Sequence, residues 1–238
     1  PNGETGIAVD CFLECREAIN RKLNSLRPFS AASTLENAFE AALFPGGKRL
    51  RPILALACGE VFGKQTDALL AVAASVELLH TASLILDDLP AMDNADARRD
   101  RPSLHRVYTP HLAILAAHGM VSQALHLPTQ AEVSDAVCRR IVAELSRCVG
   151  PHGMAAGQAN DLEGHDVTDN ALKVAAWKTG YLFRSAAYCG AVAGARLNGR
   201  LVSSPNAVFI SGSPTRSLTT CRIPRARTIR SARSTRPR

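Results

Sequence analysis

Three aspartates at the end of an apolar stretch form the group of residues best suited to chemistry. Asp87 and Asp88 directly follow Leu84-Ile85-Leu86, and Asp93 comes five residues after Asp88. If the apolar stretch is helical, these carboxylates crowd its C-terminal end, where the helix dipole disfavours negative charge. A cation would offset that repulsion, and Mg²⁺ suits a few hard oxygen ligands completed by water and phosphate. The simpler alternative is an acidic helix end exposed to solvent.

Basic residues that could hold a polyanion lie on both sides of the acidic group. Arg98 and Arg99 come shortly after Asp93, and guanidinium groups pair well with phosphate oxygens. His80 lies seven residues before Asp87, about two helical turns, and therefore on the same face of the expected helix. Taken singly, a core histidine and two solvated surface arginines would explain these residues equally well.

A glycine-rich basic loop provides another candidate phosphate site. Gly46–Pro52 reads Gly-Gly-Lys-Arg-Leu-Arg-Pro and contains Lys48 and Arg51. Backbone N–H groups at the start of a helix, together with basic side chains, suit phosphate binding. Such a loop is often only a turn. Together with the aspartates, the arginine pair and His80, however, it forms an ordered set that chance does not readily explain.

Helices joined by short connections are expected to position these groups. Apolar residues recur at helical spacing, and few segments alternate with a period of two. The expected helices cover residues 10–26, 34–43, 52–63, 67–88, 110–126, 131–148, 151–162 and 170–197. The pattern predicts an all-α bundle, and 238 residues suffice for one domain with its own core.

The composition divides the chain into residues 1–198 and an irregular tail, 199–238. Nine of the chain's arginines lie in residues 200–238, which contain no lysine and no acidic residue; the rest of the chain has 19 basic against 21 acidic residues. The tail is rich in Ser and Arg, which indicates disorder or a sequence translated in the wrong frame. The domain contains no run of about 18 apolar residues, so no membrane span is predicted.

Four motifs in order give the chain its resemblance to a known family. They are G-G-K-R-x-R-P at Gly46–Pro52, D-D-x-x-x-x-D with R-R at 87–99, G-x-x-G-M-x-x-G-Q-x-x-D-L at Gly150–Leu162, and Lys178-Thr179. The chain resembles the trans-isoprenyl diphosphate synthases over residues 10–197, and most closely the plant geranylgeranyl diphosphate synthase type. The resemblance implies an isoprenoid synthase-type helical bundle, and a location in the plastid (chloroplast).

The resemblance also implies roles for the residues that match its motifs. Isopentenyl diphosphate would bind to Lys48, Arg51, His80 and Arg99. The allylic diphosphate would contact Arg98, Lys178 and Thr179. Asp87, Asp88 and Asp93 would bind Mg²⁺.

Two departures from the family pattern affect the expected activity. The family's second D-D-x-x-D is absent, since no Asp or Glu follows Asp169 in the sequence, and we therefore expect a C-terminally incomplete bundle. Asp100 stands where the family usually has glycine. These departures are similar to those of synthase-like small subunits, which are inactive or weakly active alone and form a heterodimer with a catalytic geranylgeranyl diphosphate synthase.

Two other functions remain open. The chain could be an active Mg²⁺-dependent geranylgeranyl diphosphate synthase whose true C-terminal sequence has been replaced by the tail. It could instead bind nucleic acid or an anionic membrane through the arginines of 199–238. The tail lacks interleaved aromatic residues, so we expect no nucleic-acid partner.

Overall fold

The computed structural model describes residues 2–26, 33–62, 66–163 and 179–195. Its elements are α1 (Asn2–Ser25), α2 (Thr34–Leu43), α3 (Leu50–Glu60), α4 (Asp67–Asp87), β1 (Ala97–Arg98), β2 (Arg101–Pro102), α5 (Leu104–Val107), α6 (Pro110–His126), the 3-10 turn η1 (Leu127–Thr129), α7 (Asp135–Val149), α8 (Met154–Leu162) and α10 (Tyr181–Gly194). The predicted all-α class is confirmed, with one short hairpin as the only sheet among these residues. The tail 199–238 lies outside the described residues.

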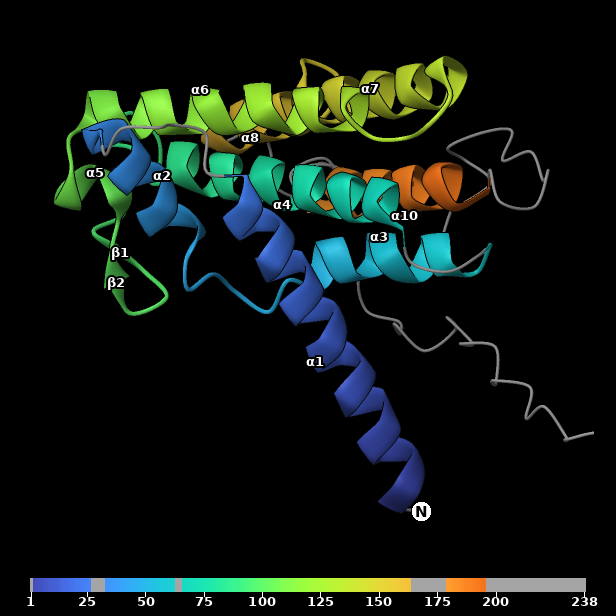
Figure 1. Ribbon diagram of the computed structural model, residues 1–238. Coiled ribbons are helices and arrows are strands. Elements are labelled where there is room, and N and C mark those ends of the chain that lie inside the picture. The colour runs from blue at the N-terminus through green and yellow to red at the C-terminus, as the bar shows by residue number, and fades with distance from the viewer. Residues whose placement is uncertain (1, 27–32, 63–65, 164–178, 196–238) are drawn as a thin grey trace, which may run out of the picture.

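Helix α4 is the centre of the bundle and contacts α3, α6 and α10 (Figure 1). It begins after Thr66, whose side chain accepts a hydrogen bond from the backbone N–H of Leu69 at 3.2 Å. Most of its residues are buried, because neighbouring helices cover it on several sides. Its length and apolar composition would also allow it to cross a membrane, but 72% of that stretch is buried inside the molecule. Burial of this kind is typical of a core helix.

Close packing of α3 against α10 brings two distant segments of the chain to one site. A Cβ atom at Gly190 would lie 2.0 Å from the carbonyl oxygen of Ala55, so only glycine allows this approach. At the other end of the contact, the guanidinium of Arg51 lies over the ring of Phe183, 4.4 Å from its centroid. The start of α10, with Thr179 just before it, is thereby held beside Arg51.

Several local features differ from the sequence-based expectation, among them the start of α1 at Asn2 and not at residue 10, and the short helix α5. The hairpin β1–β2 was not expected, because two-residue strands are too short to show alternation. Helix α7 begins at Asp135, since Ser134 has an extended backbone (φ −70°, ψ 153°). Helix α8 begins at Met154, after Gly153 in a non-helical conformation (φ −135°, ψ −126°).

Candidate active site

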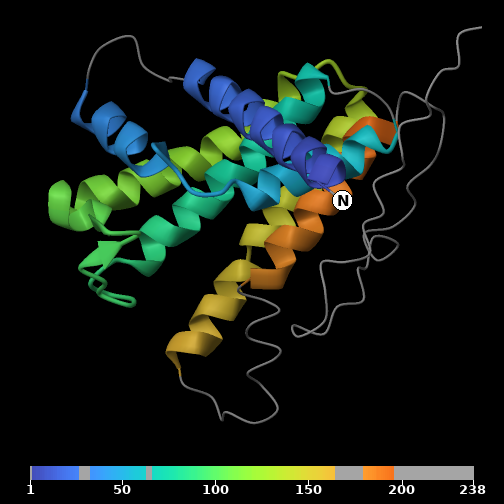
Figure 2. The same cartoon turned by 90° about the horizontal axis from the view of Figure 1, so that it is seen from below.

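A cavity of about 260 Å³ lies between the C-terminal half of α4, the loop that follows it, and the starts of α3, α8 and α10. We call it the aspartate cavity. Six of the sequence-predicted site residues line it: Arg51, His80, Asp87, Asp93, Arg98 and Thr179. They come from segments up to about 130 positions apart in the chain, so the fold, and not sequence proximity, brings them together. Both α8 and α10 border the cavity, through Met154 and Leu182, and Figure 2 shows the two helices from below.

The loop after α4 returns Asp93 to the side of Asp87. Helix α4 ends at Asp87, and the backbone N–H of Asp93 donates a 2.9 Å hydrogen bond to the carbonyl oxygen of Asp87. The next residue, Asn94, has a positive φ of 48° and donates its N–H to the carbonyl oxygen of Leu89 at 3.0 Å. Asparagine tolerates this left-handed conformation better than most residues. The turn therefore places two carboxylates on one cavity.

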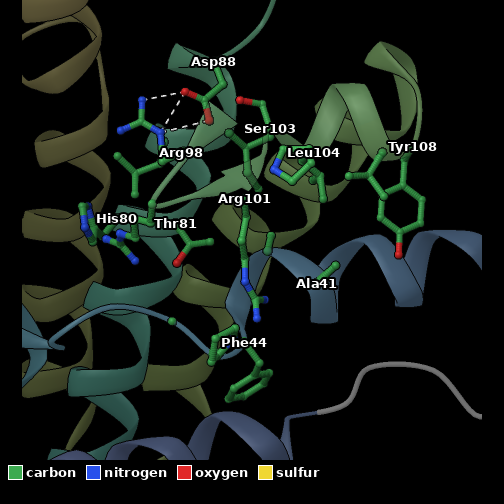
Figure 3. Close-up of a pocket in the computed structure, with 18 of the residues that line it drawn as sticks. Ala41, Phe44, His80, Thr81, Asp88, Arg98, Arg101, Ser103, Leu104 and Tyr108 are labelled. Carbon is green, nitrogen blue, oxygen red and sulfur yellow. Dashed lines mark hydrogen bonds and ion pairs between the residues drawn. The ribbon is translucent and has the colours of Figure 1, made fainter. Parts of the chain in front are cut away.

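Asp88 has different surroundings from the two aspartates beside it. Only 4% of its surface is exposed, and its carboxylate accepts hydrogen bonds from Arg98 Nε at 2.8 and 2.9 Å and from Arg98 Nη2 at 2.6 Å (Figure 3). Hydrogen bonding to Asp88 raises the pKa of Arg98, and the charge of Asp88 acts in the same direction. Such a forked ion pair fixes the plane of the guanidinium. Asp88 thus orients Arg98, and its predicted role as a metal ligand stays a prediction.

The remaining carboxylates fit one part of a magnesium site. Mg²⁺ is commonly held by one or two carboxylates, with waters and substrate phosphates completing its octahedron. Asp87 and Asp93 meet that requirement, because both line the aspartate cavity. Across residues 2–26, 33–62, 66–163 and 179–195, however, no three His, Cys, Asp or Glu side chains gather to hold a metal by themselves. A metal at this site would depend on oxygens from a bound phosphate.

His80 is a neutral hydrogen-bonding group surrounded by positive charge. Burial, together with the charges of Arg51, Arg99, Arg49 and Arg98, lowers its pKa to about 3. Its Nε2 lies 3.2 Å from Nη1 of Arg51. Arginine is always a donor, so Nε2 accepts, and the proton of the neutral ring is on Nδ1. The arginines therefore create a positive potential suited to a polyanion.

Arg49, which the sequence analysis did not single out, anchors the glycine-rich loop. Its guanidinium pairs with the buried carboxylate of Glu77 and donates to the carbonyl oxygen of Leu43 at 2.6 Å and to Asn20 Oδ1 at 3.1 Å. Its φ is 55°, an uncommon left-handed value for a non-glycine residue. Glu77 is the only acidic residue between Asp67 and Asp87 of an apolar helix. Because a buried carboxylate requires a partner, the sequence did contain a signal that a basic residue would be buried beside it.

The two glycines of the loop make room for two guanidinium groups. A Cβ atom at Gly46, where φ is 71°, would lie 2.1 Å from Arg49 Nη2. A Cβ atom at Gly47 would lie 2.6 Å from Arg99 Nη1. At Gly46 the positive φ and the buried Arg49 guanidinium favour glycine, a reason that differs from the backbone–phosphate contact expected from the sequence. At Gly47 the close contact is with the end of the exposed, flexible Arg99 side chain, which can shift.

The remaining predicted site residues lie apart from the aspartate cavity or cannot be placed. Lys48 is exposed and is not among the residues that line this cavity. Arg99 lines a neighbouring cavity together with His80 and Arg98. Lys178 lies outside the described residues.

Comparison with known proteins agrees with this geometry. The family model described as polyprenyl synthetase matches residues 32–202. The chain belongs to the polyprenyl synthetase family. Its helical bundle is an isoprenoid synthase-type fold: a crystal structure of a geranyltransferase from Legionella pneumophila superimposes with a TM-score of 0.75 at 32% identity, covering 80% of this chain and 70% of that one.

Plant members of the polyprenyl synthetase family are similar in sequence. Geranylgeranyl pyrophosphate synthase 4 of Arabidopsis thaliana is 40% identical over 184 residues, which are 75% of this chain and 50% of that protein. Heterodimeric geranylgeranyl pyrophosphate synthase large subunit 2 of the same plant is also 40% identical over 184 residues, 75% of this chain and 49% of that protein. The chain thus spans about half the length of these two relatives. Several further relatives from this plant are named as chloroplastic.

Proposed function

We propose that this chain is a non-catalytic or weakly active small subunit of a heterodimeric geranylgeranyl or geranyl diphosphate synthase. The observation that carries the proposal is an aspartate cavity with two carboxylates and several basic groups, in a sequence with no acidic residue after Asp169. Such a cavity can bind isoprenyl diphosphates, and within residues 1–238 no second aspartate motif follows Asp169. The chain would act by pairing with a catalytic geranylgeranyl diphosphate synthase and changing that partner's rate or product length.

Each predicted residue has a part in binding the two substrates. Isopentenyl diphosphate would be held by Lys48, Arg51, His80 and Arg99 and the allylic diphosphate by Arg98, Lys178 and Thr179. Arg51 and the Nδ1–H of His80 can donate to phosphate oxygens, and Asp88 keeps the Arg98 guanidinium in one orientation. The N-terminal end of α10, next to Thr179, adds the favourable end of a helix dipole.

Asp87 and Asp93 are the residues that would hold Mg²⁺, with Asp88 as a further predicted ligand. When bound, Mg²⁺ supplies positive charge that stabilises a diphosphate as it leaves the allylic carbon. Full charge neutralisation around a diphosphate needs more than one carboxylate wall, since each Mg²⁺ must complete a near-ideal octahedron. This requirement is the physical reason to expect weak turnover by the chain alone.

Names of similar proteins support the partner and the location. One relative is named as the large subunit of a heterodimeric synthase, so heterodimers occur among proteins related to this chain. Relatives named as chloroplastic support a location in the plastid. Both remain part of the proposal for this chain.

A prenyltransferase assay with isopentenyl diphosphate, an allylic diphosphate and Mg²⁺ tests the proposal. It compares this chain, a plant geranylgeranyl diphosphate synthase, and their mixture. We expect this chain alone to be nearly silent and the mixture to differ from the synthase in rate or product ratio. No change in the mixture, together with no binding of the chain to the synthase, would overturn the small-subunit role.

Variants of the aspartate cavity separate substrate binding from partner binding. Asp87→Asn with Asp93→Asn should weaken Mg²⁺-dependent binding of a non-hydrolysable allylic thiodiphosphate at least about a hundredfold, a loss of about 2.7 kcal/mol at 1.36 kcal/mol per tenfold. Asp135→Asn removes one exposed acid on α7, outside the aspartate cavity, and this control should bind normally. Equal affinity in all three proteins would show that the aspartate cavity is not the substrate site.

An active synthase is the second candidate, favoured by the 40% identity to a named geranylgeranyl pyrophosphate synthase. It predicts turnover by the chain alone that the Asp87→Asn, Asp93→Asn double variant abolishes. Measured turnover of this kind would replace the small-subunit role.

A further inference from the structure

A buried carboxylate on α7 joins that helix to the start of α10, against which α7 packs (Figure 1). Glu144 has 5% of its surface exposed. Its Oε1 accepts hydrogen bonds from α10, from Ser185 Oγ at 2.7 Å and from Arg184 Nη2 at 3.2 Å. Within α7, Arg147 Nη2 lies 2.8 Å from each oxygen of Glu144. A buried carboxylate is strongly destabilising without such partners, so these contacts hold the two helices in one relation.

The start of α10 has no capping side chain among the described residues. Its N-cap residue is Gly180, which has a helical backbone (φ −69°, ψ −33°). A capping side chain normally fixes the position at which a helix begins. Without one, the position of this end depends on the elements that pack against it. The contacts of α10 with Glu144 meet that need.

The same end of α10 supplies residues to the aspartate cavity. Thr179, just before the helix, and Leu182 line the cavity, although Glu144 and its partners do not. Ser185 follows Thr179 by six residues, about 9 Å along a helix at 1.5 Å per residue. A rotation or a shift of α10 at Ser185 would therefore move both residues that face the cavity.

An aromatic contact beside Glu144 restricts the rotation of α10. The guanidinium of Arg184 lies over the ring of Tyr181, 4.8 Å from its centroid, and that of Arg147 lies 5.6 Å from the same centroid. Such contacts between a cation and an aromatic face are attractive. Because Tyr181 and Ser185 are four residues apart on α10, they are held on one face of the helix. Two points of contact on one face fix the rotation of the helix as well as its axial position.

We infer that Glu144 is a positioning residue for the proposed allylic diphosphate site. Its hydrogen bonds to α10 fix the rotation and the axial position of that helix, and thereby the place of Thr179 in the aspartate cavity. The inference rests on the proposed binding of an allylic diphosphate at Thr179. The charge of Glu144 by itself disfavours a bound anion, so removing it would strengthen binding if charge were its only influence. A positioning role predicts the opposite result, weaker binding.

The first test is calorimetric titration of the full 238-residue chain with geranyl thiodiphosphate and Mg²⁺. Glu144→Gln keeps the size of the side chain and removes its charge. We expect it to weaken binding about tenfold, because small displacements of a contacting group lose affinity steeply. Ser185→Ala changes no charge and should weaken binding about threefold through the loss of one hydrogen bond to a charged group.

The second test is the NMR signal of the Thr179 methyl group in the chain without ligand, assigned with Thr179→Ser. Glu144→Gln and Ser185→Ala should both shift this signal, since α10 moves in each variant. A carboxylate that only stabilises the fold would lower the free energy of unfolding when removed. It would leave both the Thr179 signal and the affinity of the folded chain unchanged.

Tyr188→Phe is the matched control, because it removes another hydroxyl between the same two helices. The Tyr188 hydroxyl accepts hydrogen bonds from Arg140 Nε at 3.2 Å and Nη2 at 3.0 Å. It lies about one turn further along α10 from Thr179 than Ser185 does. The affinity and the Thr179 signal should both be unchanged in this variant. Asp135→Asn, which removes an exposed acid on α7, should likewise change neither.

Circular dichroism establishes that each variant is folded, and Ser185→Ala decides the outcome if Glu144→Gln is not. The inference is wrong if either measurement stays unchanged in the folded variants, or if Glu144→Gln binds more tightly. It is also wrong if Tyr188→Phe alters both measurements as much as Ser185→Ala. Absence of binding by the unaltered chain would overturn the proposed substrate site and this inference with it. Normal binding with unaffected variants would overturn the inference alone, so the two failures are distinguishable.

Discussion

The two cavities at the C-terminal end of α4 share Arg98 and His80 but differ in their other charged residues. The aspartate cavity combines two carboxylates with basic groups, so it suits a cation and a polyanion together. The hairpin cavity, about 300 Å³ between α2, α4, α5 and the hairpin β1–β2, is lined by apolar side chains and by Arg99 and Arg101, which form no ion pair among the described residues. The Asp88–Arg98 ion pair lies where they meet, since Arg98 lines both cavities and Asp88 lines only the hairpin cavity. Two adjacent aspartates therefore have different surroundings, because Asp87 lines the aspartate cavity and Asp88 pairs with Arg98.

The largest expected effect is the loss of the buried ion pair behind the hairpin cavity. Arg49→Ala leaves the carboxylate of Glu77, itself 2% exposed, without its cation. We expect the free energy of unfolding to fall by about 3–5 kcal/mol, the usual effect of leaving one buried charge without its partner. Urea denaturation measures it. The double variant Arg49→Met, Glu77→Leu should recover most of the loss, whereas a double variant no more stable than Arg49→Ala would contradict this explanation.

The pKa of His80 reports the burial and the positive charge that surround it where the two cavities meet. Its pKa is about 3 in the folded chain, against about 6.5 unfolded. The unfolded chain therefore binds the additional proton between these values. Stability contributed by His80 should be present above pH 6.5 and fall as the pH drops toward 3, by up to about 1.4 kcal/mol per pH unit. The slope of stability between pH 6 and pH 4, measured by urea denaturation, should be smaller in His80→Gln. An equal slope in both proteins would place the His80 pKa near its ordinary value.

The ion pair between Asp88 and Arg98 holds the Arg98 side chain where the two cavities meet. Asp88→Asn breaks a forked, partly buried pair and should lower the free energy of unfolding by about 1–2 kcal/mol. Asp96→Asn is the matched control, because the Arg106–Asp96 pair is exposed, with 45% and 83% of the two side chains accessible. Its removal should change stability by no more than about 1 kcal/mol. Similar losses in both variants, measured by thermal unfolding, would show that Asp88 does not orient Arg98 any more firmly than a surface pair.

The smallest expected effect concerns the turn of the hairpin. Arg99 and Asp100 connect β1 to β2 with φ values of 56° and 61°, where glycine is preferred at the second position. Asp100→Gly should raise the free energy of unfolding by about 0.5–1 kcal/mol by relieving this backbone strain. Asp100→Ala removes the charge but keeps the Cβ atom, so it should not stabilise the chain. If both variants are equally stable, charge repulsion rather than backbone strain governs the turn.

Sequence patterns predicted the helices better than the boundaries between them. The range expected for α2, 34–43, agrees with the observed Thr34–Leu43, because its apolar positions and its Ser33 cap are both local signals. The range expected for α4, 67–88, likewise agrees with the observed Asp67–Asp87. The hairpin and α5 were missed, since β1, β2 and α5 contain two to four residues each and carry no periodicity.

The sequence by itself determined which side chains are available for chemistry. The order of the aspartates, the arginine pair and the glycine-rich loop is a local property of the chain, and so is the absence of acidic residues after Asp169. Local spacing also placed His80 on the face of α4 that leads to Asp87.

Only the tertiary structure decided how those side chains are used. Asp87 and Asp88 are neighbours in sequence, yet one lines the aspartate cavity and the other is paired with Arg98. Arg49 and Arg51 stand two positions apart, yet one is buried against Glu77 and the other lines the aspartate cavity. The physical reason is that burial and pairing depend on which distant segments pack against each residue, and no local pattern records those contacts.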